Sequence, residues 1–259
     1  MKYFDVHTHT NYSPLDSQAK EIALECLEKN IFYVDIGTNV DTSAIAVKHA
    51  QDFSNVYASV GIHPSDIKKV DIETAMGEIE NLLVEYRNKK IVAIGETGLD
   101  YHYEGFDKDA QASVFIRHID LAKKYKLPLM VHIRDAHEDA IKILNEHAVG
   151  LKVIIHCFTG NVDLVKRYIS LGYFISINGV ITFKNTNDLK NAIRETPIAQ
   201  ILSETDAPWL SPAPERGQIN TPLKIIYVVD EIANVLGKDK ESVANQLFLN
   251  AVSFFNIII

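Results

Sequence analysis

Short runs of apolar residues alternate along the chain with longer segments in which apolar residues recur every three or four positions. The short runs are apolar at nearly every residue, which is typical of β-strands buried on both faces of a sheet. Eight runs are predicted as strands: Tyr3–Val6, Phe32–Ile36, Val56–Val60, Ile91–Ile94, Leu129–Val131, Val153–Ile155, Phe174–Ile177 and Ile201–Leu202.

The segments between these strands show the period of amphipathic helices. In three of them one face is clearly apolar: Ile72, Met76, Ile79, Leu83 and Tyr86; Ala112, Phe115, Ile116, Ile119 and Ala122; and Ile225, Ile226, Val229, Ile232, Ala233 and Leu236. Helices between successive strands make the strands parallel. Eight such units predict an α/β fold, a (β/α)8 TIM barrel forming a single domain over residues 1–259. A doubly wound open sheet is the alternative, but no strand end carries its GxGxxG fingerprint.

Composition narrows the function classes. Of the 259 residues, 47% are hydrophobic and 23% charged, as in a globular enzyme, and the net charge of −8 excludes the broad basic surface of sequence-reading DNA-binding modules. Cys26 and Cys157 lie far apart without CxxC spacing, which disfavours a disulfide framework or structural zinc knuckle and favours a reducing cytosol. Neither a membrane span nor a signal peptide is visible, so we expect a cytoplasmic protein. The apolar tail, residues 254–259, is expected to dock on the core.

Residues able to bind a metal ion follow five of the predicted strands. They are His7 and His9 after the first strand, Glu96 after the fourth, His132 after the fifth, His156 after the sixth and Asp206 after the eighth. The carboxyl ends of barrel strands meet on one face, so these side chains are expected to share one pocket. Four imidazoles and two carboxylates suit zinc, manganese, iron or, less well, magnesium. Because one ion rarely takes six protein ligands and keeps an open position, we expect two ions, about 3.5–4 Å apart and bridged by a carboxylate.

Ordered motifs extend over nearly the whole chain. They are DVHTH near the start, GIHP at 61–64, AIGETGLDYH at 93–102, MVHIRDA at 130–136, VIIHCFTG at 153–160, SETDAPWLSP at 203–212, then Arg216-Gly217 and Asn220-Thr221-Pro222. In this order they resemble the TatD family of metal-dependent deoxyribonucleases, within the amidohydrolase-like barrels. The resemblance implies a barrel, a two-ion site and 3′→5′ exonuclease action on DNA. It also implies that Glu96 bridges the ions, with His7, His9 and Asp206 at one and His132 and His156 at the other.

One departure from the family pattern follows the HxH. Thr10 and Asn11 stand where the family usually has Leu and an acidic residue, in a loop that often lines the substrate entrance. The departure bears on substrate preference and not on metal binding.

Further residues near the strand ends are candidates for substrate binding. His63 is either a phosphate contact or a turn residue. Arg134 either binds phosphate oxygens with its planar guanidinium or caps a loop. Asp100 and His102 either orient a metal ligand or stabilise their own loop. Aromatic residues on these loops stack bases or pack the loops: Trp209, Tyr101, Tyr103 and Phe158. The remaining histidines in helical segments are expected to be solvated: His49, His118, His137 and His147.

The ligand set leaves the bond to be cleaved open. Two ions with a shared hydroxide supply a nucleophile at neutral pH for phosphodiester, amide or ester hydrolysis. For a phosphodiester, ions of Mg, Mn or Zn hold the non-bridging oxygens and Asp206 accepts the water's proton, so Asp206 and Glu96 are the predicted catalytic residues. The predicted partner is then DNA engaged at a strand end, with no membrane or obligatory protein partner evident. The alternatives are an amide or ester hydrolase, such as a D-aminoacyl-tRNA deacylase, and a noncatalytic metal-holding protein.

Overall fold

The computed structural model describes residues 1–86 and 90–258. Within them, eight strands form one sheet in the order β1 to β8, and neighbouring strands are parallel. The strands are β1 (Tyr3–Thr8), β2 (Ile31–Ile36), β3 (Val56–Val60), β4 (Ile91–Asp100), β5 (Leu129–Arg134), β6 (Val153–Ile155), β7 (Phe174–Ile177) and β8 (Ile201–Ser203). The α-helices are α1 (Ala19–Glu28), α2 (Val40–Asp52), α3 (Ile72–Glu85), α4 (Lys108–Tyr125), α5 (His137–His147), α6 (Val162–Ser170), α7 (Asn187–Glu195), α8 (Ile225–Leu236) and α9 (Lys240–Phe255). Short 3-10 helices are η1 (Asp16–Gln18), η2 (Ile67–Lys69), η3 (Gly179–Thr182), η4 (Ile198–Gln200) and η5 (Pro222–Lys224).

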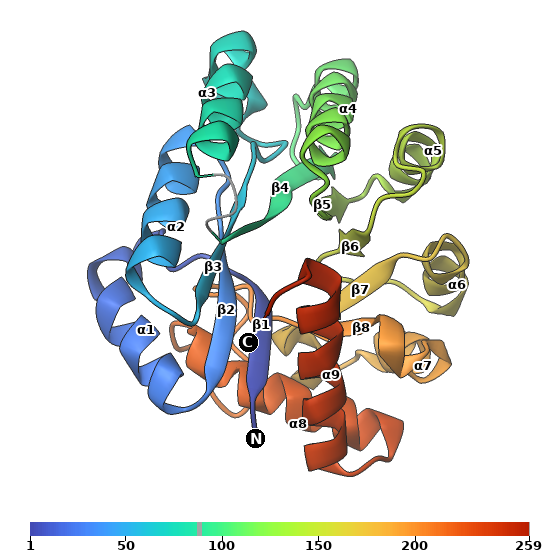
Figure 1. The fold of residues 1–259 in the computed structure, drawn as a ribbon. Helices are drawn as coiled ribbons and strands as arrows, with labels where there is room; N and C mark the ends of the chain where they lie inside the picture. The colour runs from blue at the N-terminus through green and yellow to red at the C-terminus, as the bar shows by residue number, and fades with distance from the viewer. Residues whose placement is uncertain (87–89, 259) are drawn as a thin grey trace.

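The strands curve into a nearly closed barrel, with helices α1 to α7 around its outside (Figure 1). This confirms the predicted (β/α)8 barrel and its single domain. The predicted bounds of β3, β6 and β7 agree with the structure, and the other strands start or end within a few residues of their predicted bounds, except β4. None of the described helices is long and apolar enough to cross a membrane.

The seam between β1 and β8 brings the first and last strands together. The backbone N–H of Asp206 donates to the carbonyl of His7 at 2.9 Å, and the N–H of His9 donates to the carbonyl of Ala207 at 2.8 Å. These backbone hydrogen bonds place the HxH segment against the segment that follows β8. Barrel closure therefore positions His7, His9 and Asp206 relative to one another.

Strand β4 is irregular at Glu96. Its pairing with β5 shifts between Ile94 and Thr97, where three residue steps of β4 oppose two of β5. Gly95 and Gly98 have φ of 131° and 142°, and a Cβ on either would collide with a backbone carbonyl oxygen of β5. The prediction that this strand ends at Ile94 was wrong, because it continues through a bulge to Asp100. The bulge sets the direction in which the Glu96 side chain points, and the two glycines of the GETG motif provide the backbone conformation that the bulge needs.

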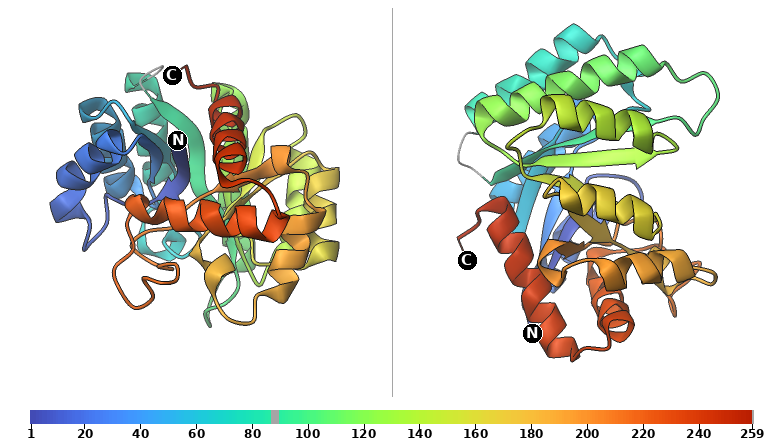
Figure 2. Two further views of the ribbon diagram at one scale, coloured as in Figure 1. Left: turned by 90° about the horizontal axis from the view of Figure 1, so that it is seen from below. Right: turned by 90° about the vertical axis from the view of Figure 1, so that its right-hand side faces the viewer.

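Helix α9 covers the amino-terminal end of the barrel. An aromatic cluster fills this end, in which Phe4 packs against Phe248 and Phe255 with ring centroids 6.3 and 5.9 Å apart. Both views in Figure 2 place the chain's amino terminus beside this helix. Only part of the tail docks as predicted: Phe255 is buried, but Ile258 is 98% exposed, and residue 259 lies outside the described residues.

Truncating this cluster should destabilise the barrel. Phe254 is 1% exposed and packs edge-on against Phe174 and Phe255, at 4.9 and 5.1 Å. We expect Phe254→Ala to lower the free energy of unfolding by about 3–5 kcal/mol, the usual effect of removing a buried phenyl ring. Leu249→Ala, on the same helix but 49% exposed, is the matched control and should change it by about 0.5 kcal/mol or less. Equal urea midpoints for the two variants would contradict this account.

Not all the helical histidines are solvated. His118 is fully buried in α4, where its Nδ1 donates to the carbonyl of Val114 at 2.8 Å and its Nε2 accepts from the N–H of Ile62 at 3.0 Å. His49 and His137 are half-buried and hydrogen-bonded to neighbouring side chains. The prediction of solvated rings was wrong for these three: the two ring nitrogens of His118 satisfy buried backbone groups, and His49 and His137 pair with the side chains of Asp35 and Tyr168.

Candidate metal centre

The six predicted ligands meet at the carboxyl end of the barrel. His7 extends from β1, Glu96 from β4 and His132 from β5, whereas His9, His156 and Asp206 lie just beyond β1, β6 and β8. All six lie in groups of three whose ligand atoms are within 4.8 Å of one another. The topology thus gathers residues from across the chain into one cluster.

One half of the cluster contains His7, His9 and Asp206. The Nε2 atoms of the two imidazoles lie 3.1 Å apart, and they are 3.7 and 3.6 Å from Asp206 Oδ1. They are also 3.5 and 3.8 Å from Oε2 of Glu96. Ligands held tetrahedrally about 2.0–2.1 Å from a zinc-sized ion would be about 3.3–3.4 Å apart, and the separations of His7 and His9 from each other and from each carboxylate are close to that value.

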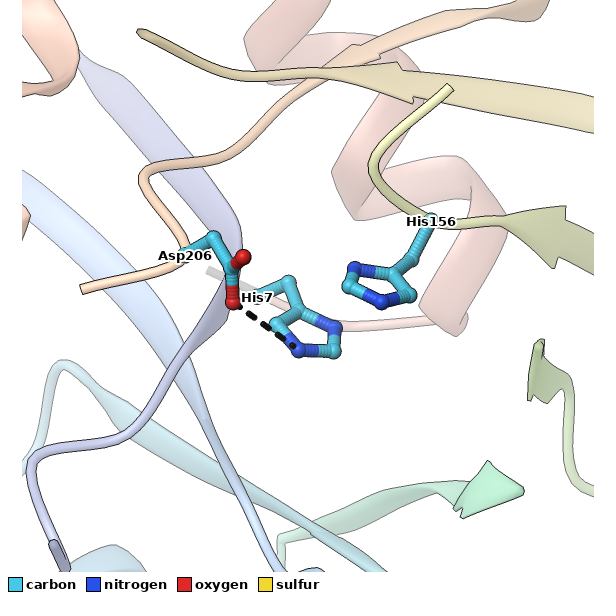
Figure 3. Close-up of side chains that lie close together, drawn as sticks. All are labelled: His7, His156 and Asp206. Atoms are coloured by element: carbon cyan, nitrogen blue, oxygen red, sulfur yellow. Dashed lines mark ion pairs between the residues drawn. The ribbon is translucent and has the colours of Figure 1, made fainter. Parts of the chain in front are cut away.

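The other half contains His132 and His156. Oε1 of Glu96 lies 2.9 Å from His156 Nε2 and 3.0 Å from His132 Nδ1, and these two nitrogens are 3.3 Å apart. The two oxygens of Glu96 therefore face different pairs of imidazoles. Figure 3 shows how the halves adjoin: the His7 ring lies between the Asp206 carboxylate and the His156 ring, with the two rings stacked 3.9 Å apart.

Hydrogen bonds behind the cluster fix the orientation of the imidazoles. His9 Nδ1 donates to the carbonyl of Ile36 at 3.1 Å, and His132 Nε2 donates to Asp100 Oδ2 at 3.0 Å. In each neutral ring the opposite nitrogen then presents a lone pair to the cluster. A lone pair that faces a carboxylate oxygen repels it unless a proton or a metal ion lies between them, so the arrangement favours bound positive charge.

The electrostatics of the cluster also favour bound positive charge. Burial opposes a charged His156, but Glu96 and Glu204 outweigh it and raise the pKa of this imidazole well above its usual range. Burial likewise opposes an ionised Glu96, but the surrounding imidazoles hold the pKa of this carboxyl well below its usual range. Protons and divalent cations therefore compete for the same donor atoms.

Two buried carboxylates beside the cluster, those of Glu204 and Asp5, were not predicted from the sequence as functional residues. Glu204 accepts from the N–H of Cys157 at 2.8 Å and lies 3.5 Å from His156 Nδ1. Asp5 accepts from the N–H groups of Thr205 at 2.9 Å and of His7 at 3.2 Å. Their positions inside the motifs DVHTH and SETDAP were the only indication in the sequence. Whether these carboxylates are buried, and which groups they contact, cannot be derived from their proximity to the ligands in the sequence.

His63 and Asp100 lie beside the second half of the cluster. His63 Nε2 is 3.5 Å from Glu96 Oε1, and its Nδ1 accepts from the N–H of Ser65 at 3.1 Å. Burial and the nearby His132 lower the pKa of His63 to about 4, so the ring is neutral and carries its proton on Nε2. His63 thus presents a hydrogen-bond donor to the cluster, and Asp100 orients His132.

The other candidate substrate contacts lie farther out. Arg134 is exposed and donates to the hydroxyl of Tyr103 at 3.3 Å, and His102 pairs with Asp135 at 2.9 Å, so neither reaches the ligands. Trp209 packs its ring edge-on against a ligand, His9. Roles in substrate binding stay predictions for all three.

Thr10 and Asn11 do not line an entrance. They are 0% and 4% exposed, and Asn11 Nδ2 donates to the carbonyls of Ile36 and Thr42, both at 2.9 Å. The expected position at a substrate entrance was wrong, because Asn11 joins the end of β2 to the first turn of α2.

A (β/α)8 barrel with these clusters at its strand ends is the architecture of a metal-dependent hydrolase. Residues 4–256 match the family described as TatD related DNase, and the chain belongs to this family. It is 37% identical over 241 residues to an uncharacterized metal-dependent hydrolase of Mycoplasma genitalium, covering 91% of this chain and 92% of that protein. It is 36% identical over 257 residues to the hydrolase YabD of Bacillus subtilis, covering 98% and 99%. The crystal structure of YjjV, a TatD homologue from Escherichia coli, superposes with a TM-score of 0.92 at 26% identity, covering 99% and 98%. The predicted family is confirmed.

Proposed function

We propose that this metal-dependent hydrolase is a 3′→5′ exodeoxyribonuclease that acts on single-stranded DNA with two divalent ions. The observation that carries the two-ion proposal is that the two carboxylate oxygens of Glu96 face different pairs of imidazoles. Glu96 would bridge, with His7, His9 and Asp206 around one ion and His132 and His156 around the other. When bound, such ions make water nucleophilic at neutral pH and neutralise charge on phosphoryl oxygens.

Exposure distinguishes the floor of the site from its mouth. The side chains of His7, His9, Glu96 and His156 are at most 5% exposed, whereas those of Asp206 and His132 are 14% and 16% exposed. A water approaching from solvent therefore meets Asp206 and His132 at the mouth, and of these two Asp206 is the carboxylate. We assign Asp206 the role of accepting the proton of the attacking water, and His63 Nε2–H that of donating to a substrate oxygen.

The choice of DNA rests on the family and on charge. The family is described as DNase-related, and a chain of net charge −8 suits a strand end entering the site better than a duplex along a basic groove. The predicted phosphate contact from Arg134 would lie at the outer rim, where that side chain is exposed.

The proposal is tested with the metal-loaded protein and 5′-labelled single-stranded DNA. We expect shortening from the 3′ end, complete loss of activity with chelator, and no cleavage of a circular strand of the same sequence. Aminoacyl-tRNA and a panel of small esters serve as competing substrates. Circular and linear strands cut at equal rates would contradict exonuclease action. Intact DNA with cleaved ester or aminoacyl-tRNA would establish the alternative hydrolase, and no hydrolysis with normal metal content would favour a metal-holding protein.

Glu204 should strengthen metal binding through His156. Glu204→Gln removes the negative charge facing His156 Nδ1 but leaves an oxygen to accept from the N–H of Cys157. We expect the affinity for Mn²⁺ or Zn²⁺ to fall about 10–100-fold, the usual effect of losing such a partner. Calorimetric titration measures it. Glu195→Gln, which removes an equal charge from α7 at 53% exposure, is the control and should bind metal normally. Wild-type affinity in Glu204→Gln would contradict the role of Glu204.

A further inference from the structure

Two large aromatic side chains stand half-exposed beside the first half of the metal centre. Tyr12 is 43% exposed and Trp209 is 47% exposed, with ring centroids 5.6 Å apart and planes inclined by 54°. The Trp209 ring also meets His9 edge-on at 5.2 Å. Tyr12 lies three residues after His9, and Trp209 lies three residues after Asp206. Each ring therefore belongs to the same loop as one of these two ligands.

The backbone beneath both rings is held by hydrogen bonds. The N–H of Tyr12 donates to the carbonyl of His9 at 3.2 Å, and its own carbonyl accepts from Leu15 at 2.8 Å. The N–H of Trp209 donates to the carbonyl of Asp206 at 3.0 Å, and its carbonyl accepts from the Asn220 side chain at 2.6 Å. These bonds fix the backbone from which both rings extend, and the contact between the two rings limits their rotation, so less freedom is lost on binding.

We infer that Tyr12 and Trp209 stack a nucleobase that flanks the scissile phosphodiester, on the side of His7, His9 and Asp206. Every base has a π face, so aromatic stacking binds single strands without selecting sequence. The net charge of −8 disfavours attraction of the phosphate backbone over a long tract, so base stacking would add to the affinity that the proposed metal ions and Arg134 supply locally. The inference rests on the proposed function, because it assigns a subsite to that DNA substrate.

The opposite side of the centre is shaped differently. Asp100, which orients His132, also borders a cavity of about 150 Å³ together with Ser65, Lys68 and Phe106. That cavity also has two exposed rings, Tyr103 and Phe106. The Tyr103 ring is covered by the Arg134 guanidinium at 5.3 Å, and the Phe106 ring is stacked on Tyr101 at 4.7 Å. The Tyr12–Trp209 pair, which contacts the ligand His9 through Trp209, is therefore the surface we assign to stacking.

The single tryptophan of the chain allows a direct test of binding. Thymidine 5′-monophosphate titrated into the metal-loaded protein should quench the fluorescence of Trp209, whereas deoxyribose 5-phosphate should not. Tyr12→Ala should weaken nucleotide binding about 5- to 50-fold, and Tyr12→Phe, which keeps a ring, should not. Tyr227→Ala, on α8 at 37% exposure, is the control for an exposed tyrosine elsewhere. Equal quenching by both ligands, or unchanged binding by Tyr12→Ala, would overturn the inference.

Kinetics on paired oligonucleotides separate stacking from a structural effect. One strand has normal bases and the other carries abasic sites at its last two positions. We expect Tyr12→Ala to lose about tenfold in kcat/KM on the normal strand and to match wild type on the abasic strand, with unchanged metal content. Equal losses on both strands would overturn the inference in favour of a packing role. If wild type cuts no DNA but nucleotide still quenches Trp209 through Tyr12, the exonuclease proposal fails and the stacking surface stands.

Discussion

Glu96→Ala should lose both metal ions, not one. Oε2 of Glu96 faces the Nε2 atoms of His7 and His9, and Oε1 faces the nitrogens of His132 and His156, so its loss removes a ligand from each half. We expect metal content to fall from about two ions per chain to near background, and DNA hydrolysis to fall by about 10³-fold or more, since removal of one electrostatic group alone costs about 10²–10³. Elemental analysis and single-turnover rates on the same preparations measure both.

Glu96→Gln is the matched comparison. Glutamine has the same size but a single oxygen, so it can serve only one half of the centre, and we expect about one ion per chain. Far-ultraviolet circular dichroism should show a folded barrel for both variants, because the ligand cluster lies above the apolar core. Two ions retained by Glu96→Ala would show that the carboxylate is not a bridge.

The sequence predicted the barrel because each strand contains a short run that is apolar at nearly every residue. It did not predict the irregularities that aim the ligands. Three residue steps of β1 between Asp5 and Thr8 oppose two of β2, and β4 shifts in the same way around Glu96. A bulge changes which side of a strand a residue faces, and it is set by pairing with a neighbour that local periodicity does not encode.

The supporting residues were missed for a related reason. The ligands stand out because histidines and carboxylates recur at strand ends. Glu204 and Asp5 carry the same kind of side chain, each two residues from a ligand, Asp206 and His7. Only the packed structure shows that Glu204 reaches the far nitrogen of His156. Burial is likewise a tertiary property, which is why His118 could not be distinguished from a solvated histidine by its helical position.

Asp206→Asn should separate metal binding from catalysis. Oδ1 of Asp206 lies 3.7 and 3.6 Å from the Nε2 atoms of His7 and His9. His156 also lies within 4.8 Å of Asp206, but its Nε2 is closer to Oε1 of Glu96, at 2.9 Å. We therefore assign Asp206 to the half that contains His7 and His9. Its backbone has φ of 55°, a left-handed conformation that asparagine tolerates and alanine does not, so the asparagine variant keeps the local fold. The amide retains one ligating oxygen but is a far weaker base than the carboxylate. We therefore expect most of the metal to remain while the rate falls about 10²–10⁴-fold, the usual effect of removing a general base.

The acid limb of the pH–rate profile identifies the source of that loss. Burial would raise the pKa of Asp206, but the nearby imidazoles of His9, His156 and His7 outweigh it and lower this pKa. A base with a lowered pKa is ionised throughout the neutral range, so the wild-type rate should fall only as pH drops into the acid range, and Asp206→Asn should lose that dependence at constant metal content. Near-normal turnover by Asp206→Asn would remove the catalytic role. A loss of rate in strict proportion to lost metal would reduce Asp206 to a ligand, because proton transfer would then make no separate contribution.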